Sequence, residues 1–224
     1  MPISKGSLSC RLYRAQDDLP PDYEERFPRQ LRRHWFHEID SRRGEDRSTG
    51  WVNLRHLLDT EPNWDEMCLY PWLLLGLRRD RKSLNPALLR ARIELKIEEI
   101  CKEKSVERIG KQERKAVTEQ VKMDMLVEQT PSTQIIEAAW NLQSGLVVFG
   151  AASENAGLIF SDLFTETFQV ELWPMLPFTL AEKWTEGQGK PELLELLRPT
   201  IFSSLYDQLA QEAVTQNADL LHEE

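Results

Sequence analysis

Four basic residues stand almost together at positions 78–82, where an apolar stretch of the chain gives way to a charged one. They are Arg78, Arg79, Arg81 and Lys82. Guanidinium and ammonium groups bind phosphates, and a cluster of them supplies affinity that is independent of sequence. The run therefore predicts a phosphate contact. The alternative is a solvated strand end whose charges are paired with Asp80 and with acids of the next helix.

A second group of basic residues crowds positions 102–122. Its members are Lys102, Lys104, Arg108, Lys111, Arg114, Lys115 and Lys122. Glutamates are interleaved with them, so helix-stabilising pairs four residues apart explain the pattern as well. In a dimer, the bases of two copies would add up on one surface while the acids faced outward.

A third candidate is an expected helix whose outer face carries arginines. These are Arg26, Arg29, Arg32 and Arg33, of which Arg29 and Arg33 are included among the predicted nucleic-acid contacts. A solvated helix face is the alternative interpretation.

One pattern would suit metal-dependent cleavage of nucleic acid. Asp80 followed by Glu94 and Lys96 superficially matches the acid-then-Glu-x-Lys pattern of restriction-type nucleases, whose carboxylates hold a divalent ion. In those enzymes the Glu-x-Lys lies on a strand. Here it falls within an expected helix, where residues i and i+2 diverge, so we expect no nuclease site and no catalytic residue.

His34, His37 and Asp40 are spaced so that they would share one face of a helix. Two or three ligands without a second cluster favour a surface helix over a metal site. The chain also lacks a Gly-rich phosphate loop and a Ser/His/Asp or Cys/His arrangement. We expect no metal and no cofactor.

The central positioning element is a predicted helical hairpin at residues 84–131. Asn85 and Pro86 begin its first helix, Gly110 ends it, and a second helix covers residues 111–126. Each helix has one narrow apolar stripe: Leu89, Ile93, Ile97 and Ile100 in the first, and Val117, Val121 and Met125 in the second. The other faces are charged, so the pair is expected to project from the body as an arm.

Strands and helices flank this arm. Before it, the spacing predicts strands at 7–15, 51–54 and 67–82, a helix through Phe27, Leu31, Trp35 and Ile39, and a charged loop at 41–50. After it, the spacing predicts strands at 134–142, 146–151 and 170–173, helices opened by Ser153 and at 178–184, and a helical tail over 191–218. Trp140 and Trp173 are expected in the core, and Trp35 and Trp184 at helix–sheet seams.

These elements predict an α+β fold, with a mixed or antiparallel sheet backed by helices and a protruding two-helix arm. The expected organisation is a first half of the core at 1–83, the arm at 84–131, a second half at 132–186 and an acidic helical tail at 187–224.

Composition is that of a soluble globular chain: 224 residues, 41% hydrophobic and 29% charged. The net charge of −9 is unevenly spread, because residues 1–110 hold 21 bases against 19 acids and residues 125–224 hold three against 15. Such polarity would let a basic surface bind phosphate while the acidic rear faces solvent. No apolar run is long enough to span a membrane, and three distant cysteines indicate reduced thiols in a cytoplasm.

In order and local pattern, residues 7–185 resemble the RdgC family of bacterial recombination-associated proteins. The resemblance rests on an opening strand at 8–14, a Gly50-Trp51-Val52 strand, an apolar strand that leads to Pro86, the two charged helices, the hairpin Asn141-Leu142-Gln143-Ser144-Gly145-Leu146-Val147-Val148, and Trp184. Members are similar in being soluble dimers that encircle duplex DNA without sequence preference and antagonise the recombinase filament. The family is also labelled an exonuclease.

Two departures bear on these expectations. The family's second arm helix ends in a Leu-Leu-Pro-Arg-Ala-Phe motif that helps to close the ring, whereas this chain reads Met125-Leu126-Val127-Glu128-Gln129-Thr130-Pro131. Longer members also continue past the point at which this chain ends.

The resemblance thus implies a non-enzymatic protein that binds double-stranded DNA, acts as a homodimer and limits recombinase access. It would be cytoplasmic and nucleoid-associated, with a recombinase as a further partner and no membrane contact. The alternative is a protein-interaction module or DNA mimic of the same family that has lost DNA binding. A metal-dependent exonuclease is the remote alternative.

Overall fold

The computed structural model describes residues 8–16 and 19–195. Residues 196–224, which include most of the predicted helical tail, lie outside the described residues. The chain forms two compact units, Met1–Met175 and Leu176–Glu224.

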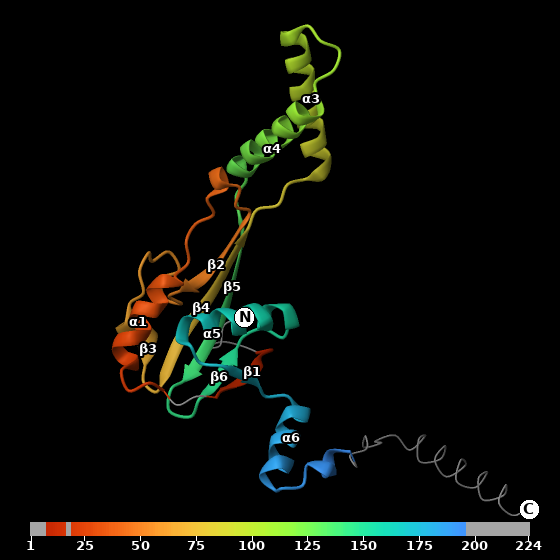
Figure 1. Cartoon of the computed structure of the whole chain (residues 1–224). Coiled ribbons are helices and arrows are strands. Elements are labelled where there is room, and N and C mark those ends of the chain that lie inside the picture. Colours follow the sequence, from red (N-terminus) through yellow and green to blue (C-terminus); the bar gives the residue numbers. More distant parts are fainter. Residues whose placement is uncertain (1–7, 17–18, 196–224) are drawn as a thin grey trace, which may run out of the picture. The chain divides into compact units, whose positions relative to one another are not determined.

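A seven-stranded antiparallel sheet forms the body of the first unit (Figure 1). Its order is β2-β4-β5-β6-β1-β7, with β3 paired to the start of β4. The strands are β1 (Arg11–Ala15), β2 (Arg47–Val52), β3 (Cys68–Leu69), β4 (Trp72–Arg81), β5 (Ser132–Asn141), β6 (Leu146–Phe149) and β7 (Leu172–Pro174). Together with the helices, this sheet confirms the predicted α+β fold class.

One face of the sheet is covered by α1 (Tyr23–Arg33) and α5 (Glu154–Phe168), which also contact each other (Figure 1). Side chains alternate between the two faces of β4, and Leu73, Leu75 and Leu77 point to the same face and are fully buried. The two helices cover this apolar face. Aromatic rings from helices and strands fill the space between: Phe27, Trp51, Trp140, Phe149, Phe160, Phe164 and Phe168. Trp140 is 1% exposed, as predicted, whereas Trp173 is half-buried.

Two glycines of the first unit occupy positions where a side chain would be disfavoured. Gly145 closes the hairpin between β5 and β6 with a φ of +71°, a backbone conformation that side chains disfavour. Gly50 lies against the passing chain, since a Cβ at this position would come within 2.5 Å of the Cα of Phe36. The Gly50-Trp51 pair therefore allows the segment after α1 to lie directly against β2.

The predicted arm is present as α3 (Pro86–Lys104) and α4 (Lys111–Glu128). Asn85 caps α3 by accepting hydrogen bonds from the backbone N–H groups of residues 87 and 88, as its position before Pro86 predicted. No residue of α3 is buried. In α4 the buried residues, Val121, Met125 and Leu126, lie in the half of the helix nearer the sheet.

Two sequence predictions near the start of the chain are corrected. The first helix was expected to reach Ile39, but α1 ends at Arg33. Beyond it, Trp35 bridges Trp51 of β2, and the N–H of Phe36 donates to the Trp51 carbonyl at 2.9 Å. Hydrogen bonds to the edge of β2 thus take the place of the helical turns that were predicted after Arg33.

The charged segment 41–50, predicted to be a loop, is largely ordered. It contains the short 3₁₀ helix η1 (Ser41–Arg43) and the first residues of β2, in which Arg47 lies opposite Arg81. The predicted strand 67–82 is also divided. Its first part belongs to the short helix α2 (Trp64–Met67) and to β3, and the cis Tyr70–Pro71 turn leads into β4.

The second unit is described up to residue 195 and contains α6 (Pro177–Gly187) and the short 3₁₀ helix η2 (Pro191–Leu194). The Thr179 hydroxyl accepts a hydrogen bond from the backbone N–H of Leu176 and so caps α6. Trp184, expected at a helix–sheet seam, is instead 63% exposed. Within the described residues, no helix is both long and apolar enough to cross a membrane.

Candidate nucleic-acid interface

The basic run 78–82 alternates along β4, so its members face opposite sides of the sheet. On one side, Arg78 makes a two-pronged contact with Asp80, its Nε and Nη2 donating to the two carboxylate oxygens at 3.1 and 2.8 Å. Asp80 is 3% exposed, and the Arg78 guanidinium also stacks on the ring of Phe36 at 4.0 Å. Arg78 is therefore a structural residue of the body in this conformation.

Lys82 is also engaged, at the point where the sheet meets the arm. Its Nζ donates to the Ser41 hydroxyl and to the Leu126 carbonyl, both at 2.9 Å. Leu126 lies in the last turns of α4, and α4 contacts η1 there. Lys82 thus joins three segments: the end of β4, η1 and the arm root.

Arg79 and Arg81 point to the other side of β4, the side that α5 covers further along the strand. Directly opposite Arg81 on β2 is Arg47, a residue that sequence analysis did not single out. Arg47 was not identified from the sequence because residues 41–50 were predicted to form a loop. Only the pairing of β2 with β4 brings Arg47 beside Arg79 and Arg81. Arg47 hydrogen-bonds Asp46 at 3.0 Å, and this bond lowers the pKa of Asp46.

At the arm tip, some of the predicted cations are paired. Lys104 contacts Glu113 across the turn between α3 and α4, and this hydrogen bond raises the pKa of Lys104. The hydrogen bond from Lys96 is the main cause of the lowered pKa of the Glu99 carboxyl, and the charge of Lys102 makes a small further contribution. An ion pair between the two helices thus accounts for Lys104, and it is not one of the predicted pairs within a helix, whereas Lys102 interacts with an acid of its own helix.

The remaining arm cations lie on one face of α4. Lys111, Arg114, Lys115 and Lys122 recur at helical spacing, with Thr118 among them. Lys111, Arg114, Lys115 and Thr118 line a shallow depression of about 600 Å³. Within residues 8–16 and 19–195, none of these four cations makes a side-chain hydrogen bond or ion pair, and Arg108 in the preceding turn makes none either.

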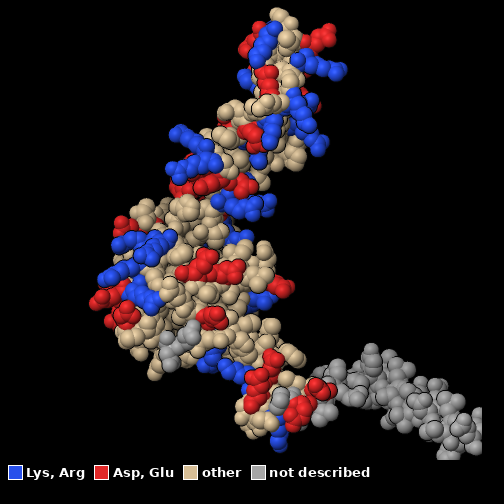
Figure 2. All heavy atoms as spheres, viewed as in Figure 1, with Lys and Arg blue, Asp and Glu red and all other residues tan. Residues whose placement is uncertain are grey.

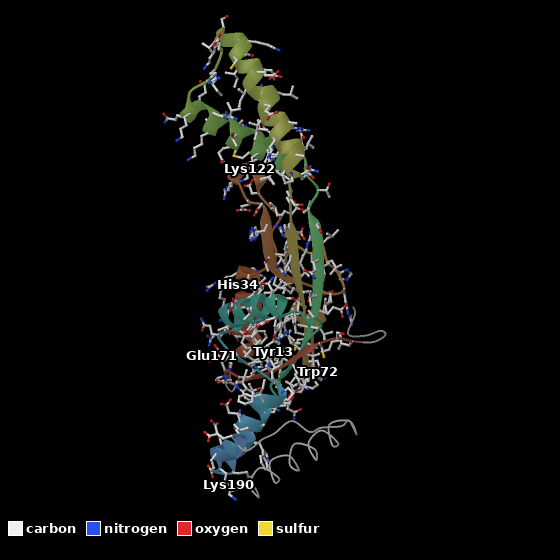
Figure 3. The ribbon with its side chains drawn as sticks, turned by 90° about the vertical axis from the view of Figure 1, so that its right-hand side faces the viewer. Tyr13, His34, Trp72, Lys122, Glu171 and Lys190 are labelled. Atoms are coloured by element: carbon white, nitrogen blue, oxygen red, sulfur yellow. The ribbon has the colours of Figure 1, made fainter. Side chains whose placement is uncertain are left out.

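Helical geometry shows that the basic face of α4 lies on the same side of the helix as Leu126. Leu126 lies one turn beyond Lys122 and three turns beyond Lys115, so all three share a side of α4. That side contacts η1 at the arm root. Figure 3 labels Lys122 at the end of the arm nearest the sheet, while Trp72 marks the opposite end of β4. The acids Glu113 and Asp124 lie on the other side of the helix, whereas Glu119 lies at the edge of the basic face, four residues from Lys115.

The arginines of α1 are mostly paired. Arg29 approaches Glu25 at 3.6 Å, Arg32 approaches Glu61 at 3.4 Å, and Arg26 donates to the side-chain carbonyl of Gln169. Arg33 is exposed and makes no side-chain hydrogen bond or ion pair within the described residues. On the face shown in Figure 2, basic and acidic side chains are interleaved over the body and the arm. On the basic face of α4 and among the arginines of the sheet, bases outnumber acids, since Glu119 lies at the edge of the former and Asp46 bonds Arg47 in the latter.

The structure separates the residues of the two metal patterns. Asp80 is held by Arg78 inside the sheet, whereas Glu94 and Lys96 lie on the exposed helix α3, where Lys96 pairs with Glu99 at 2.9 Å. His34 and His37 follow the end of α1 and so do not share a helical turn. Across the described part of the chain, no three His, Cys, Asp or Glu side chains are grouped as metal ligands.

Comparison with known proteins places the chain in a family. A family model described as "Putative exonuclease, RdgC" matches residues 9–208, which is most of the chain. The chain therefore belongs to the RdgC family, and this membership supports a role related to DNA recombination. A comparison with curated proteins gave no match.

Proposed function

We propose that this protein binds DNA without sequence preference and thereby limits access of a recombinase to it. The observation that carries the proposal is the basic face of α4, formed by Lys111, Arg114, Lys115 and Lys122. Cations that form no ion pair within the described chain can bind phosphates without first breaking a bond. Family membership supplies the link to recombination.

The overall charge of −9 does not oppose this binding mode. Charges more than about 10 Å apart in solvent are largely screened at 0.1 M salt, so a ligand responds mainly to the local surface. On α4 that surface is basic, because four cations share it, Glu113 and Asp124 lie on the other side of the helix, and Glu119 at its edge is the one acid of the helix beside them. Phosphate contacts of this kind carry no sequence information.

A dimer would double this surface, and α3 offers a reason for one. Leu88 and Leu95 are 48% and 60% exposed, and the isoleucines of the same helix are only half-buried. A helix with so little cover gains stability when a second chain packs against it. We therefore propose a homodimer as the DNA-binding form, with binding as its function and no nuclease chemistry.

The proposal is tested by removing the basic face while matching the charge change elsewhere on the arm. The test variant is Lys111→Gln/Arg114→Gln/Lys115→Gln. The control is Arg92→Gln/Lys96→Gln/Lys104→Gln, which removes three arm cations that are each paired with a glutamate. Binding of a duplex is measured by fluorescence anisotropy over a range of salt concentrations.

The test variant is expected to bind at least tenfold more weakly. Its salt slope is expected to fall by about 0.9 for each phosphate that the variant no longer neutralises. The control is expected to bind almost as well as the natural chain. Equally weakened binding by the two variants would reject α4 as the contact surface, and absence of binding by the natural chain at low salt would reject DNA binding altogether.

Exposed apolar residues on α6 favour the second candidate, a protein-interaction module. Phe178 and Trp184 are 64% and 63% exposed, and Leu176 and Leu180 accompany them. Large exposed aromatic side chains are typical of protein interfaces. Co-purification of a protein partner without nucleic acid, abolished in Phe178→Ser/Trp184→Ser, would support this function over DNA binding.

A further inference from the structure

The sheet carries a second basic site, in a pocket near the arm root. Three adjacent strands place residues side by side in two rows: Thr49, Arg79 and Gln134 in one, and Arg47, Arg81 and Ser132 in the next. Directly opposed residues in antiparallel strands share a face, and so do residues two apart. The two rows therefore form one continuous polar surface.

This surface continues the face of the sheet that α5 covers. The preceding row consists of Trp51, Leu77 and Ile136, all buried in the core. Beyond this row the sheet extends past the helix, and Asn155 of the first turn of α5 reaches the rim. The result is a pocket of about 690 Å³, a volume within the range of small-ligand sites.

The charges inside this pocket are poorly balanced. Arg47 lies directly across from Arg81, and like charges in directly opposed positions destabilise a sheet. Asp46 offsets part of this charge through its bond to Arg47. Arg79 makes no side-chain hydrogen bond or ion pair within the described residues. Asp80, the one acid among the lining residues, is held on the opposite side of the sheet by Arg78.

Three guanidinium groups and one offsetting carboxylate leave about two positive charges for a ligand. A phosphate at the end of a nucleic-acid strand carries about −1.5 to −2 at pH 7, whereas a phosphodiester within the strand carries one negative charge. The forked guanidinium group binds phosphate oxygens in pairs. The charge of the pocket therefore matches a terminal phosphate better than an internal one.

The neutral lining fits the rest of a terminal nucleotide. The hydroxyls of Thr49, Ser83 and Ser132 can donate to phosphate oxygens, and the amides of Gln134 and Asn155 can bond a sugar or base edge. None of the described residues that line the pocket is aromatic, so it offers no stacking platform for a base. Recognition would thus depend on the phosphate and not on the identity of the base.

We propose that this pocket, defined by Arg47, Arg79 and Arg81, binds the terminal phosphate of a nucleic-acid strand. The proposal rests on the DNA binding proposed above and gives that activity a preference for phosphorylated ends. Ser83 lies in the connection from β4 to α3 and Ser132 is the first residue of β5 after the connection from α4, so an end bound here sits beside the arm root. The basic face of α4 starts from the same root.

The experiment compares three probes in anisotropy and competition assays: a duplex with terminal phosphates, the same duplex with hydroxyl ends, and a closed circular duplex. A fourth probe, a 5′-phosphorylated dinucleotide, is titrated alone by calorimetry. The phosphorylated duplex is expected to bind at least tenfold more tightly than the hydroxyl-ended one. In Arg79→Gln this ratio is expected to fall to about one.

Arg81 is exposed, so Arg81→Gln provides a second variant should the half-buried Arg79 prove necessary for folding. Arg55→Gln, an exposed arginine outside the pocket, is the control and is expected to keep the ratio. Equal affinity for phosphorylated and hydroxyl ends overturns the terminal-phosphate site, and so does a ratio that survives both pocket variants.

The probes also separate this proposal from the one on which it rests. Circular DNA that binds without any end preference retains DNA binding and rejects the pocket. Dinucleotide binding that disappears in Arg79→Gln, with no binding of circular DNA, retains the pocket and rejects the binding along duplex DNA. If no probe binds, both proposals fail.

Discussion

In the sheet, Arg78 and Lys82 donate to other groups of the chain, whereas on α4 Lys111 and Lys115 contact no acid among the described residues. Burial explains the difference. A charge removed from water must be paired to be tolerated, while a charge on an exposed helix remains hydrated and needs no partner. A cluster of bases in the sequence therefore has different meanings in the two regions: it is structural where β4 ends, and on the basic face of α4 it makes no ion pair within the described chain.

The arginines in the sheet pocket are an exception within the body. Arg79 and Arg81 belong to the same strand as Arg78, yet they face the pocket beyond α5 and not an acid. One strand thus divides its basic residues between a buried ion pair and the proposed phosphate pocket. Alternation of side chains, and not residue type, makes this division.

The largest expected effect is the loss of stability when a fully buried side chain is truncated. Phe164 is fully buried among aromatic rings, and Phe164→Ala is expected to lower the free energy of unfolding by about 3–5 kcal/mol. In the single chain, Leu95→Ala on the arm removes a residue that is 60% exposed and is expected to change the free energy of unfolding by less than about 0.5 kcal/mol. Denaturant unfolding at low protein concentration measures both, and equal losses there would contradict the contrast between body and arm. An additional loss in Leu95→Ala that appears only at high protein concentration is expected where the proposed homodimer covers α3.

The second largest loss of stability is expected at the buried ion pair between Arg78 and Asp80. Asp80→Ala leaves the Arg78 guanidinium, 14% exposed, without its partner, and is expected to cost about 3 kcal/mol. Glu113→Ala removes the acid that pairs with Lys104 at the arm tip and is expected to leave the thermal midpoint unchanged, because that pair is solvated. Similar midpoints for the two variants would contradict the contrast between body and arm.

A smaller, local effect is expected at the junction of the two regions. Lys82→Met removes the hydrogen bonds to Ser41 and Leu126, and only the Leu126 bond, worth about 1.5 kcal/mol, holds α4 directly. Amide hydrogen exchange in the last turns of α4 is expected to accelerate by about tenfold, while exchange in β4 and β5 stays as in the natural chain. Unchanged exchange in α4 would show that Lys82 does not hold the arm root.

The smallest effect concerns thiol reactivity in the body. Burial raises the pKa of the Cys68 thiol, and nearby Glu24 and Asp65 raise it further. A raised pKa leaves less thiolate at pH 8, so alkylation of Cys68 is expected to be several-fold slower than that of the exposed Cys10 and to need a higher pH. Mass spectrometry of a time course over pH 7–10 measures both sites, and equal rates would contradict the burial of Cys68.

Local signals made the arm and the core strands predictable. Asn85-Pro86 and Gly110 mark helix ends, and the alternating leucines of β4 mark a buried face, because each depends on neighbours within a few residues. The end of α1 and the start of β2 were not predictable in this way. Trp35 lies beyond the end of α1 and forms a β-bridge with Trp51. Arg47 belongs to a strand because it pairs with β4.

The sequence by itself determined the α+β fold class, the two-helix arm, the positions of the basic residues and membership of the RdgC family, and it left open whether the sheet is mixed or antiparallel. Only the tertiary structure decided which of those basic residues have partners. Asp80 and Arg78 are two residues apart, yet strand geometry is what places both on one side, and Arg47 reaches Arg79 and Arg81 only through pairing of distant strands. Charge is fixed by residue type, but whether a charge is neutralised depends on what folding brings within about 4 Å of it.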